Sequence, residues 1–301
     1  MILTNALLAV FVGLGLAQTT TDPKPVASQV CPSDTKLATL LAASSIVLIG
    51  KMDVPEERLM EDARKPSPGY LDISIEVENV VKGEGISSAA VRVYPKDSFY
   101  QPSNRALLDL SGKSAILFLT RVDDGPIGLY FAGRTPDALQ QANDLTVAAA
   151  RAEVARQGNV IASWRANEKL PHSDKVRALI ARLGLVSGNQ QQRIFDQLEA
   201  LGAAAVPAII AQMDDRRPLR TQAISLVNHA PDAFEGIRHY GPKQVVDGLD
   251  AVLNQITGAR FGQITNGGSD FQRDATVAGW RVFAADLTCG KTNSAQPAFP
   301  R

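Results

Sequence analysis

Hydrophobic residues in the first half of the chain recur at every second position, which is the spacing of a β-strand. Within residues 70–80 apolar and polar side chains alternate, so one face of the predicted strand is apolar and the other is polar. Further strands are predicted at 46–51, 90–94, 115–120 and 127–132, and a short helix capped by Ser33 or Asp34 precedes them. Five strands in about 90 residues, without a long helix between them, predict a small closed antiparallel β-barrel.

The second half of the chain repeats its hydrophobic residues at helical spacing instead. Thr135-Pro136-Asp137 is typical of a helix start, because a capping hydroxyl precedes a proline at the first helical position. No strand is predicted from there to residue 287. Each apolar row must be buried against a neighbouring helix, and the rows lie at 176–183, 206–213, 245–256 and 280–287.

These two patterns predict an α+β protein with two domains. Residues 31–134 are expected to form the β-barrel domain, and residues 135–290 an all-α domain. Residues 291–301 read as a polar tail.

The amino-terminal residues predict export. Residues 2–16 are nearly all apolar, which matches the core of a signal peptide and is short for a membrane span. Gly15-Leu16-Ala17 offers small residues where a signal peptidase reads, so we predict a signal peptide over 1–17 and a linker over 18–30. No Lys or Arg precedes the apolar core, so a buried amino-terminal helix stays the alternative. A periplasmic or secreted protein is expected.

Two cysteines remain after the predicted cleavage. Cys31 and Cys289 lie near the two ends of the mature chain and could pair in an oxidising compartment. A loop of that length would stabilise the fold by on the order of 5 kcal/mol in the chain-entropy treatment. Two unrelated thiols are the alternative, and neither cysteine has the C-x-x-C spacing of a redox or metal site.

The predicted barrel carries a family resemblance. A strand that ends in Gly50-Lys51, a second that ends in "ENVVKG" and a third that reads "AILFLT" resemble the netrin-like, OB-type module of metalloproteinase inhibitors and bacterial exported proteins. In those inhibitors the amine of an amino-terminal cysteine chelates the zinc of the target enzyme. Cys31 precedes the first helix in the same way, but it lies well inside the predicted mature chain. The resemblance implies inhibition of an exported peptidase as an alternative function.

The helical half carries a second resemblance, over residues 195–215, "FDQLEALGAAAVPAIIAQMDD". It resembles a HEAT-type repeat, in which Gly-Ala and Val-Pro mark the turn between two helices. Residues 216–229 would then begin the next unit. Only one unit is well formed, and repeat arrays need about three to be stable alone. A short, irregular helical domain with HEAT-like geometry is therefore expected.

Catalytic motifs are matched only in part. Ser33 and Lys36 fit the S-x-x-K pattern of penicillin-recognising enzymes, but the companion motifs are missing apart from a remote Lys291-Thr292-Asn293, and a helix cap explains Ser33 better. The glycine-rich stretch 266–270 follows no predicted strand, so it reads as a loop between helices and not as a phosphate cradle.

The three histidines also fit no known motif, because His172, His229 and His239 lack the H-E-x-x-H spacing. His229 and His239 flank Phe234 and could meet Asp232 or Glu235 on a loop, so a cleft there stays open.

The sequence thus favours a non-catalytic exported protein that serves as a protein-binding or scaffold module. No catalytic, cofactor or metal residue is assigned, and the expected partner is another protein. Nucleic acid is not expected as a partner, since Lys plus Arg and Asp plus Glu are both 31. The alternatives are the peptidase inhibitor described above and an unrecognised hydrolase, for which the fold would have to bring Ser, His and Asp together.

Overall fold

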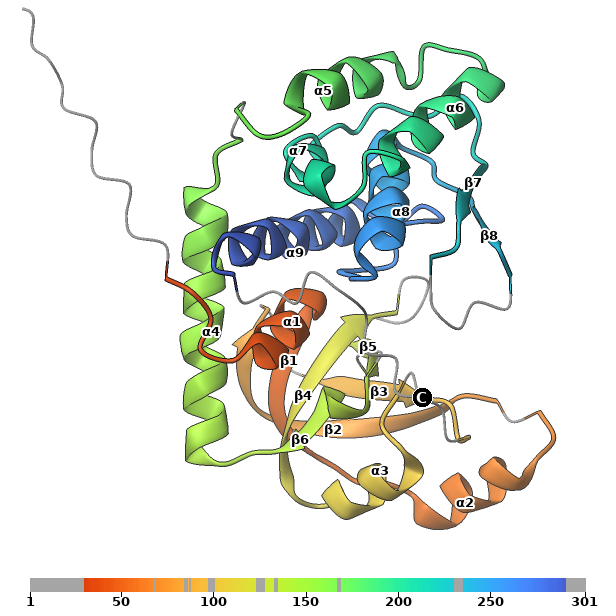
Figure 1. The fold of residues 1–301 in the computed structure, drawn as a ribbon. Helices are drawn as coiled ribbons and strands as arrows, with labels where there is room; N and C mark the ends of the chain where they lie inside the picture. Colours follow the sequence, from red (N-terminus) through yellow and green to blue (C-terminus); the bar gives the residue numbers. More distant parts are fainter. Residues whose placement is uncertain are drawn as a thin grey trace, which may run out of the picture.

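The amino-terminal half of the computed structural model forms a closed barrel of five strands (Figure 1). The strands are β1 (Ile46–Met52), β2 (Leu71–Lys82), β3 (Ala89–Val93), β4 (Ser114–Arg121) and β5 (Leu129–Ala132). Their order is β1-β2-β3-β5-β4, and pairing of β4 with β1 closes the barrel. This architecture confirms the predicted barrel and is compatible with an OB-like fold.

The structure describes residues 30–67, 69–83, 86, 88–96, 101–122, 128–132, 135–166, 169–229 and 235–290. The predicted signal peptide, nearly all of the predicted linker and the predicted polar tail lie outside these residues.

One pairing in the barrel differs from the all-antiparallel expectation. Strands β3 and β5 run parallel, whereas the other neighbouring strands are antiparallel. The reason lies in the connection, because helix α3 (Asn104–Leu110) and strand β4 separate β3 from β5 along the chain. Such an intervening crossover is what a parallel pair requires.

The barrel core follows directly from the alternation in the sequence. In β2 the side chains of Leu71, Ile73 and Ile75 are buried, while the polar residues between them are exposed. Strand β1 lies between β2 and β4, and Gly50 faces Val77 on one side and Ala115 on the other. A Cβ atom at Gly50 would lie 2.6 Å from the carbonyl oxygen of Glu76, so only glycine fits this close pairing.

The helix predicted to begin at Thr135 is much shorter than expected. The Thr135 hydroxyl caps only a single 3-10 turn, η1 (Pro136–Ala138), and strand β6 (Leu139–Gln141) then pairs with β4. The barrel sheet therefore continues past the predicted boundary at residue 134. Burial of Ala138 and Leu139 against the barrel outweighs the local helix signal. Helix α4 (Asp144–Ser163) starts after it, with a capping box between Asn143 and Thr146.

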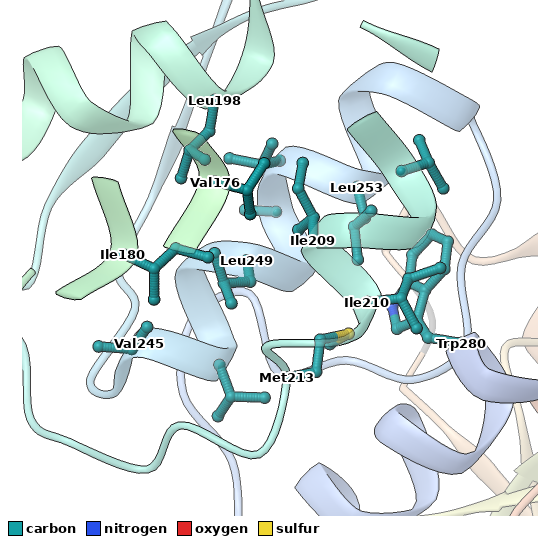
Figure 2. Packing of buried hydrophobic residues seen from close by; sticks show 14 of the residues in the cluster. Val176, Ile180, Leu198, Ile209, Ile210, Met213, Val245, Leu249, Leu253 and Trp280 are labelled. Atoms are coloured by element: carbon teal, nitrogen blue, oxygen red, sulfur yellow. The ribbon is translucent and has the colours of Figure 1, made fainter. Parts of the chain in front are cut away.

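The carboxy-terminal half is mainly helical. After α4 come α5 (Ser173–Arg182), α6 (Gly188–Glu199), the 3-10 turn η2 (Ala203–Ala205), α7 (Val206–Ile210), α8 (Val245–Thr257) and α9 (Asp270–Thr288). The four predicted apolar rows meet in one cluster, and Figure 2 shows α5, α6, α7 and α8 contributing side chains around Leu249, with Trp280 of α9 beside them. Helices α6 and α7 follow each other along the chain, joined by the turn at Gly202 and η2, and both pack against α5 and α8.

The all-α expectation for this half is wrong at the segment that was expected to start a second repeat unit. Strand β7 (Ile224–Val227) pairs with β8 (Ile237–Tyr240) as a two-stranded antiparallel ribbon. Ile224 and Leu226 are buried, whereas Ser225 and Val227 between and after them are not. This period of two suits a strand, because a helix would need apolar residues three or four apart.

Three helices join the two halves. Helix α1 (Thr35–Ala43), which Asp34 caps, packs against α4 and α9, and α4 runs from β2 to α9 (Figure 1). Ala42 of α1 belongs to the helical core and Ala150 of α4 to the barrel core, so the two cores stay separate but share these helices. Helix α2 (Glu56–Arg64), with α3, lies at the far end of the barrel (Figure 1).

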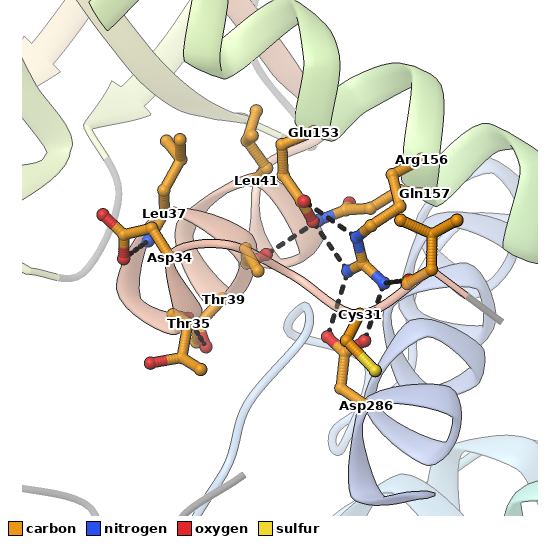
Figure 3. A network of polar contacts seen from close by, with 12 residues as sticks. Cys31, Asp34, Thr35, Leu37, Thr39, Leu41, Glu153, Arg156, Gln157 and Asp286 are labelled. Atoms are coloured by element: carbon orange, nitrogen blue, oxygen red, sulfur yellow. Dashed lines mark hydrogen bonds and ion pairs between the residues drawn. The ribbon is translucent and has the colours of Figure 1, made fainter. Parts of the chain in front are cut away.

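A disulfide and several polar contacts stabilise the packing of α1, α4 and α9 between the two halves. Cys31 and Cys289 form a disulfide, which settles the alternative that the sequence left open. Beside it, Figure 3 shows the buried guanidinium of Arg156 between Glu153 (2.7 and 2.8 Å) and Asp286 (2.8 and 3.1 Å). At the other end of α1, the Lys82 ammonium donates to the carbonyls of Leu41 and Ser44, and burial lowers the pKa of Lys82 to about 8. Within the described residues no helix is long and apolar enough to cross a membrane.

Candidate functional site

A groove of about 840 Å³ lies between α6, η2, the β7–β8 ribbon and the end of α8. We call it the ribbon groove, and the residues that line it include Gln192, Asp196, Glu199, Ser225, Val227, His229, Ile237 and Ile256. The groove falls in the region where the sequence left a cleft open beside Phe234. Phe234 itself, with Asp232, lies outside the described residues.

Side chains of α6 fix the ribbon in place. The Gln192 amide donates to the carbonyl of Ser225 (2.6 Å) and accepts from its N–H (2.9 Å). Its neighbour Gln191, which is fully buried, makes the same pair of contacts with the backbone of Thr221 (2.7 and 3.4 Å). The side-chain amides of two successive glutamines thus make the backbone hydrogen bonds that a neighbouring strand would otherwise make. This edge of β7 is therefore satisfied and is not free to pair with another chain.

Glu199, at the end of α6, supplies the most unusual charge in the groove. Its side chain is only 8% exposed, one carboxylate oxygen accepts the Val227 N–H (3.4 Å), and the other lies 3.2 Å from Nε2 of His229. That second oxygen, Oε1, is buried and accepts no hydrogen bond of good geometry. Burial raises the pKa of Glu199, and nearby Asp196 raises it further, whereas the Val227 N–H and His229 act in the opposite direction.

The charge of the groove is negative. Asp196 and Glu199 are its two carboxylates, and none of the described residues that line it is Lys or Arg. Asp196 is exposed and accepts a hydrogen bond from Gln192 (2.7 Å), whereas Glu199 is buried, and a buried carboxylate favours a cationic group that can donate hydrogen bonds to it.

An apolar wall faces these carboxylates. Val227 and Ile237 are opposite each other in the ribbon, and they are 50% and 52% exposed. Leu226 and Ile256 extend this wall within the groove. Large apolar side chains that face solvent together, next to polar groups, are typical of an interaction surface.

The two histidines that the sequence singled out have different partners. Nδ1 of His239 lies 2.9 Å from the Ser225 hydroxyl, with no carboxylate on the ring among the described residues. His229 contacts the Glu199 carboxylate, with no serine or cysteine nearby in the described part of the chain. The described residues therefore do not assemble the Ser, His and Asp that a hydrolase would need. They also hold no group of three His, Cys, Asp or Glu side chains close enough for a metal ion.

The other motifs lie away from the groove. Ser33 precedes Asp34, whose side chain caps α1, and residues 291–293 lie outside the described part of the chain. Within 266–270, Ser269 caps α9 with Gln272, and Asn266 Oδ1 accepts the Gly241 N–H at 2.7 Å.

Apart from His229, the sequence analysis did not single out the residues that line the groove. Gln192 belongs to no motif, the HEAT-type resemblance gives Glu199 and Val227 no role, and 28 residues separate the Glu199–Val227 contact. The alternation of Ile224, Ser225 and Leu226 was a signal that could have revealed the ribbon. Comparison with protein-family models, curated proteins and solved structures found no match to this chain.

Proposed function

We propose that this is a non-catalytic exported protein that binds an extended basic segment of another protein in the ribbon groove. The observation that carries the proposal is the Glu199 carboxylate, which is nine-tenths buried and has an oxygen without a well-aligned hydrogen bond. The only described side chain beside this oxygen is His229, with Nε2 at 3.2 Å, and a buried carboxylate that is paired so weakly favours a cationic donor from a bound partner.

The shape and lining of the groove favour a Lys or Arg side chain of a partner. These side chains combine an apolar stem with a cationic head. The stem would lie along Val227 and Ile237, and the head would reach the carboxylates of Glu199 and Asp196. A groove of about 840 Å³ has room for more than one side chain of such a segment.

Binding, and not catalysis, is supported by how the polar groups are used. Gln191, Gln192 and Glu199 are engaged with the backbone of the ribbon, so they hold the groove in shape. His239 and His229 are each engaged with a different side chain.

Export and the finer family resemblances belong to the same proposal. The disulfide between Cys31 and Cys289 supports an oxidising compartment. The strand order, with parallel β3 and β5, supports a netrin-like, OB-type barrel, and the order helix, turn at Gly202, helix supports HEAT-like geometry over α6 and α7 alone. Inhibition of a peptidase through the barrel is the competing function, and it would place the binding surface on residues 31–134.

The test is a selection of random peptides on the full chain, followed by affinity measurements. Selected peptides are expected to contain Lys or Arg, and Glu199→Gln is expected to weaken their binding about tenfold or more. Gln has nearly the same shape as Glu and keeps an acceptor for the Val227 N–H. Because the pKa of Glu199 is raised, binding should also weaken as the pH falls through that raised value.

Asp174→Asn is the matched control. Asp174 lies on α5 with its side chain 98% exposed, and its substitution removes the same charge away from the groove. The proposal is wrong if the selected peptides lack basic residues, or if Glu199→Gln binds them as well as Asp174→Asn does.

A further inference from the structure

A second, smaller cavity lies against the other face of the β7–β8 ribbon. Its volume is about 170 Å³, and it is lined by Arg238, Tyr240, Asn254, Arg260, Gly262, Gln263, Thr265 and Asn266. Side chains alternate between the two faces of a strand, so Arg238 and Tyr240 of β8 point away from the face that carries Ile237. The cavity is therefore separate from the ribbon groove.

Two arginines give this cavity its chemistry. Within the described residues neither Arg238 nor Arg260 has an ion pair within 4 Å or a side-chain hydrogen bond, although Arg260 acts electrostatically on the buried Asp250 and lowers its pKa. By contrast, Arg217 and Arg273 of the same half are each bound to an aspartate. The described lining of the small cavity contains no Asp or Glu. Two half-buried cations thus face one polar space whose described lining has no carboxylate, and the carboxyl that Arg260 does influence, Asp250, is fully buried outside this lining.

We propose that this cavity binds a small oxyanion, a phosphate or a carboxylate, between Arg238 and Arg260. A guanidinium presents a planar fork of N–H donors that matches two oxygens of such a group. Neutral donors complete the site. The Asn266 amide oxygen already accepts the Gly241 N–H (2.7 Å), which leaves its NH₂ group as a donor, and the Thr265 hydroxyl lies in the same lining.

The wall of the cavity is held in a fixed conformation. Gly262 has a φ of 148°, and a Cβ atom there would lie 2.0 Å from the Thr276 hydroxyl oxygen. Next to it, Phe261 is buried against Trp280, with ring centroids 4.8 Å apart. The loop that carries Arg260 is thus anchored by the two residues directly after it, which lowers the entropy lost when an anion binds.

The test is calorimetric titration of the full chain with inorganic phosphate, sulfate and acetate, each at constant pH and ionic strength. At least one of these anions is expected to bind saturably. Phosphate or sulfate binding alone would identify a tetrahedral oxyanion as the ligand, and equal or better acetate binding would identify a carboxylate. Arg238→Gln and Arg260→Gln are each expected to weaken binding about tenfold or more.

Two further variants separate a site from a general charge effect. Arg151→Gln removes the same charge from an exposed position on α4, and it is expected to leave binding unchanged. Arg238→Lys keeps the charge but loses the fork, so an intermediate loss is expected. If Arg260→Gln fails to fold, the two Arg238 variants test the proposal instead. Arg238 is a half-buried residue of the short strand β8, so its substitution is expected to leave the fold intact. The proposal is overturned if none of the three anions binds, or if the Gln variants weaken binding no more than Arg151→Gln.

Discussion

The barrel and the helical half differ in how many charged side chains they bury. Among the described residues, charged residues that are buried as a whole all lie in the helical half, and they are Glu153, Arg156, Asp247, Asp250, Arg273 and Asp286. The buried polar residues of the barrel half, Ser44 and Asn104, are neutral. The ion pairs of the barrel strands, such as Arg92 with Asp72, lie at the surface. Apart from the Lys82 ammonium, which donates to two backbone carbonyls, the barrel is therefore held by apolar packing, whereas the helical half also depends on paired buried charges.

Removal of a buried charge from the helical half is therefore expected to lower the free energy of unfolding the most. Arg273 is 6% exposed and contacts Asp247, which is fully buried, at 2.8 and 3.1 Å. Arg273→Met is expected to destabilise the protein by about 3–5 kcal/mol, because it leaves the Asp247 carboxylate without its cation. Urea denaturation, followed by tryptophan fluorescence, measures this, since both tryptophans (Trp164 and Trp280) lie in the helical half.

Arg92→Met is the matched control in the barrel. Arg92 makes two contacts with Asp72 (2.7 and 2.8 Å), but both side chains are partly exposed to solvent. Its loss is expected to cost less than about 1 kcal/mol. Equal losses in the two variants would contradict the comparison between the halves.

The second largest expected change in the free energy of unfolding comes from Asp250 and depends on pH. Asp250 is fully buried, and burial raises its pKa to about 7, although the Trp280 indole N–H (2.7 Å) and Asn254 oppose the rise. In the unfolded chain this carboxyl titrates near 3.8. The stabilisation from its protonated form is therefore complete below that value and is lost as the pH rises through about 7.

Asp250→Asn removes this dependence while keeping an acceptor for the indole N–H. The variant is expected to be more stable than the natural protein at pH 8, by about 2–4 kcal/mol, and to lose that advantage near pH 4. Urea denaturation at several pH values measures the difference. An advantage that stays constant between pH 4 and pH 8 would show that Asp250 does not titrate in this range.

The smallest expected change in the free energy of unfolding comes from Asp72 in the barrel. Its pH dependence is opposite to that of Asp250, because this contribution is lost as the pH falls. The Arg92 side chain lowers the pKa of Asp72, so the stabilisation from this pair is present at neutral pH and is lost as the pH falls through the lowered value. Asp72→Asn is expected to cost well under about 1 kcal/mol at pH 7, because the pair is partly exposed. The same series of denaturation curves tests it, and any stabilisation at pH 7 would contradict the sign.

The sequence predicted the barrel better than the ribbon for a physical reason. Strand β2 has twelve residues, so its alternation is visible over many positions. Strands β6, β7 and β8 have only three or four residues each, and pairing in space decides their conformation. The cue at Thr135-Pro136 was a real cap, but it governs a single turn because the next residues pair with β4.

The candidate site was the least predictable part of the molecule. A cleft near His229 could be anticipated, because irregular sequence lies between two regular regions. Its chemistry could not, since the properties of Glu199 depend on burial by the ribbon and on Asp196. The arginines of the small cavity come from β8 and from the loop after α8, so only the tertiary fold brings them together.

Hydrogen exchange of the full chain, with and without a selected basic peptide, tests the central claim most directly. If the helical half carries the binding function, the peptide should slow amide exchange in β7, β8 and the last turn of α6. Slower exchange confined to the barrel strands β1–β5 would contradict the account and would favour inhibition of a peptidase through the barrel.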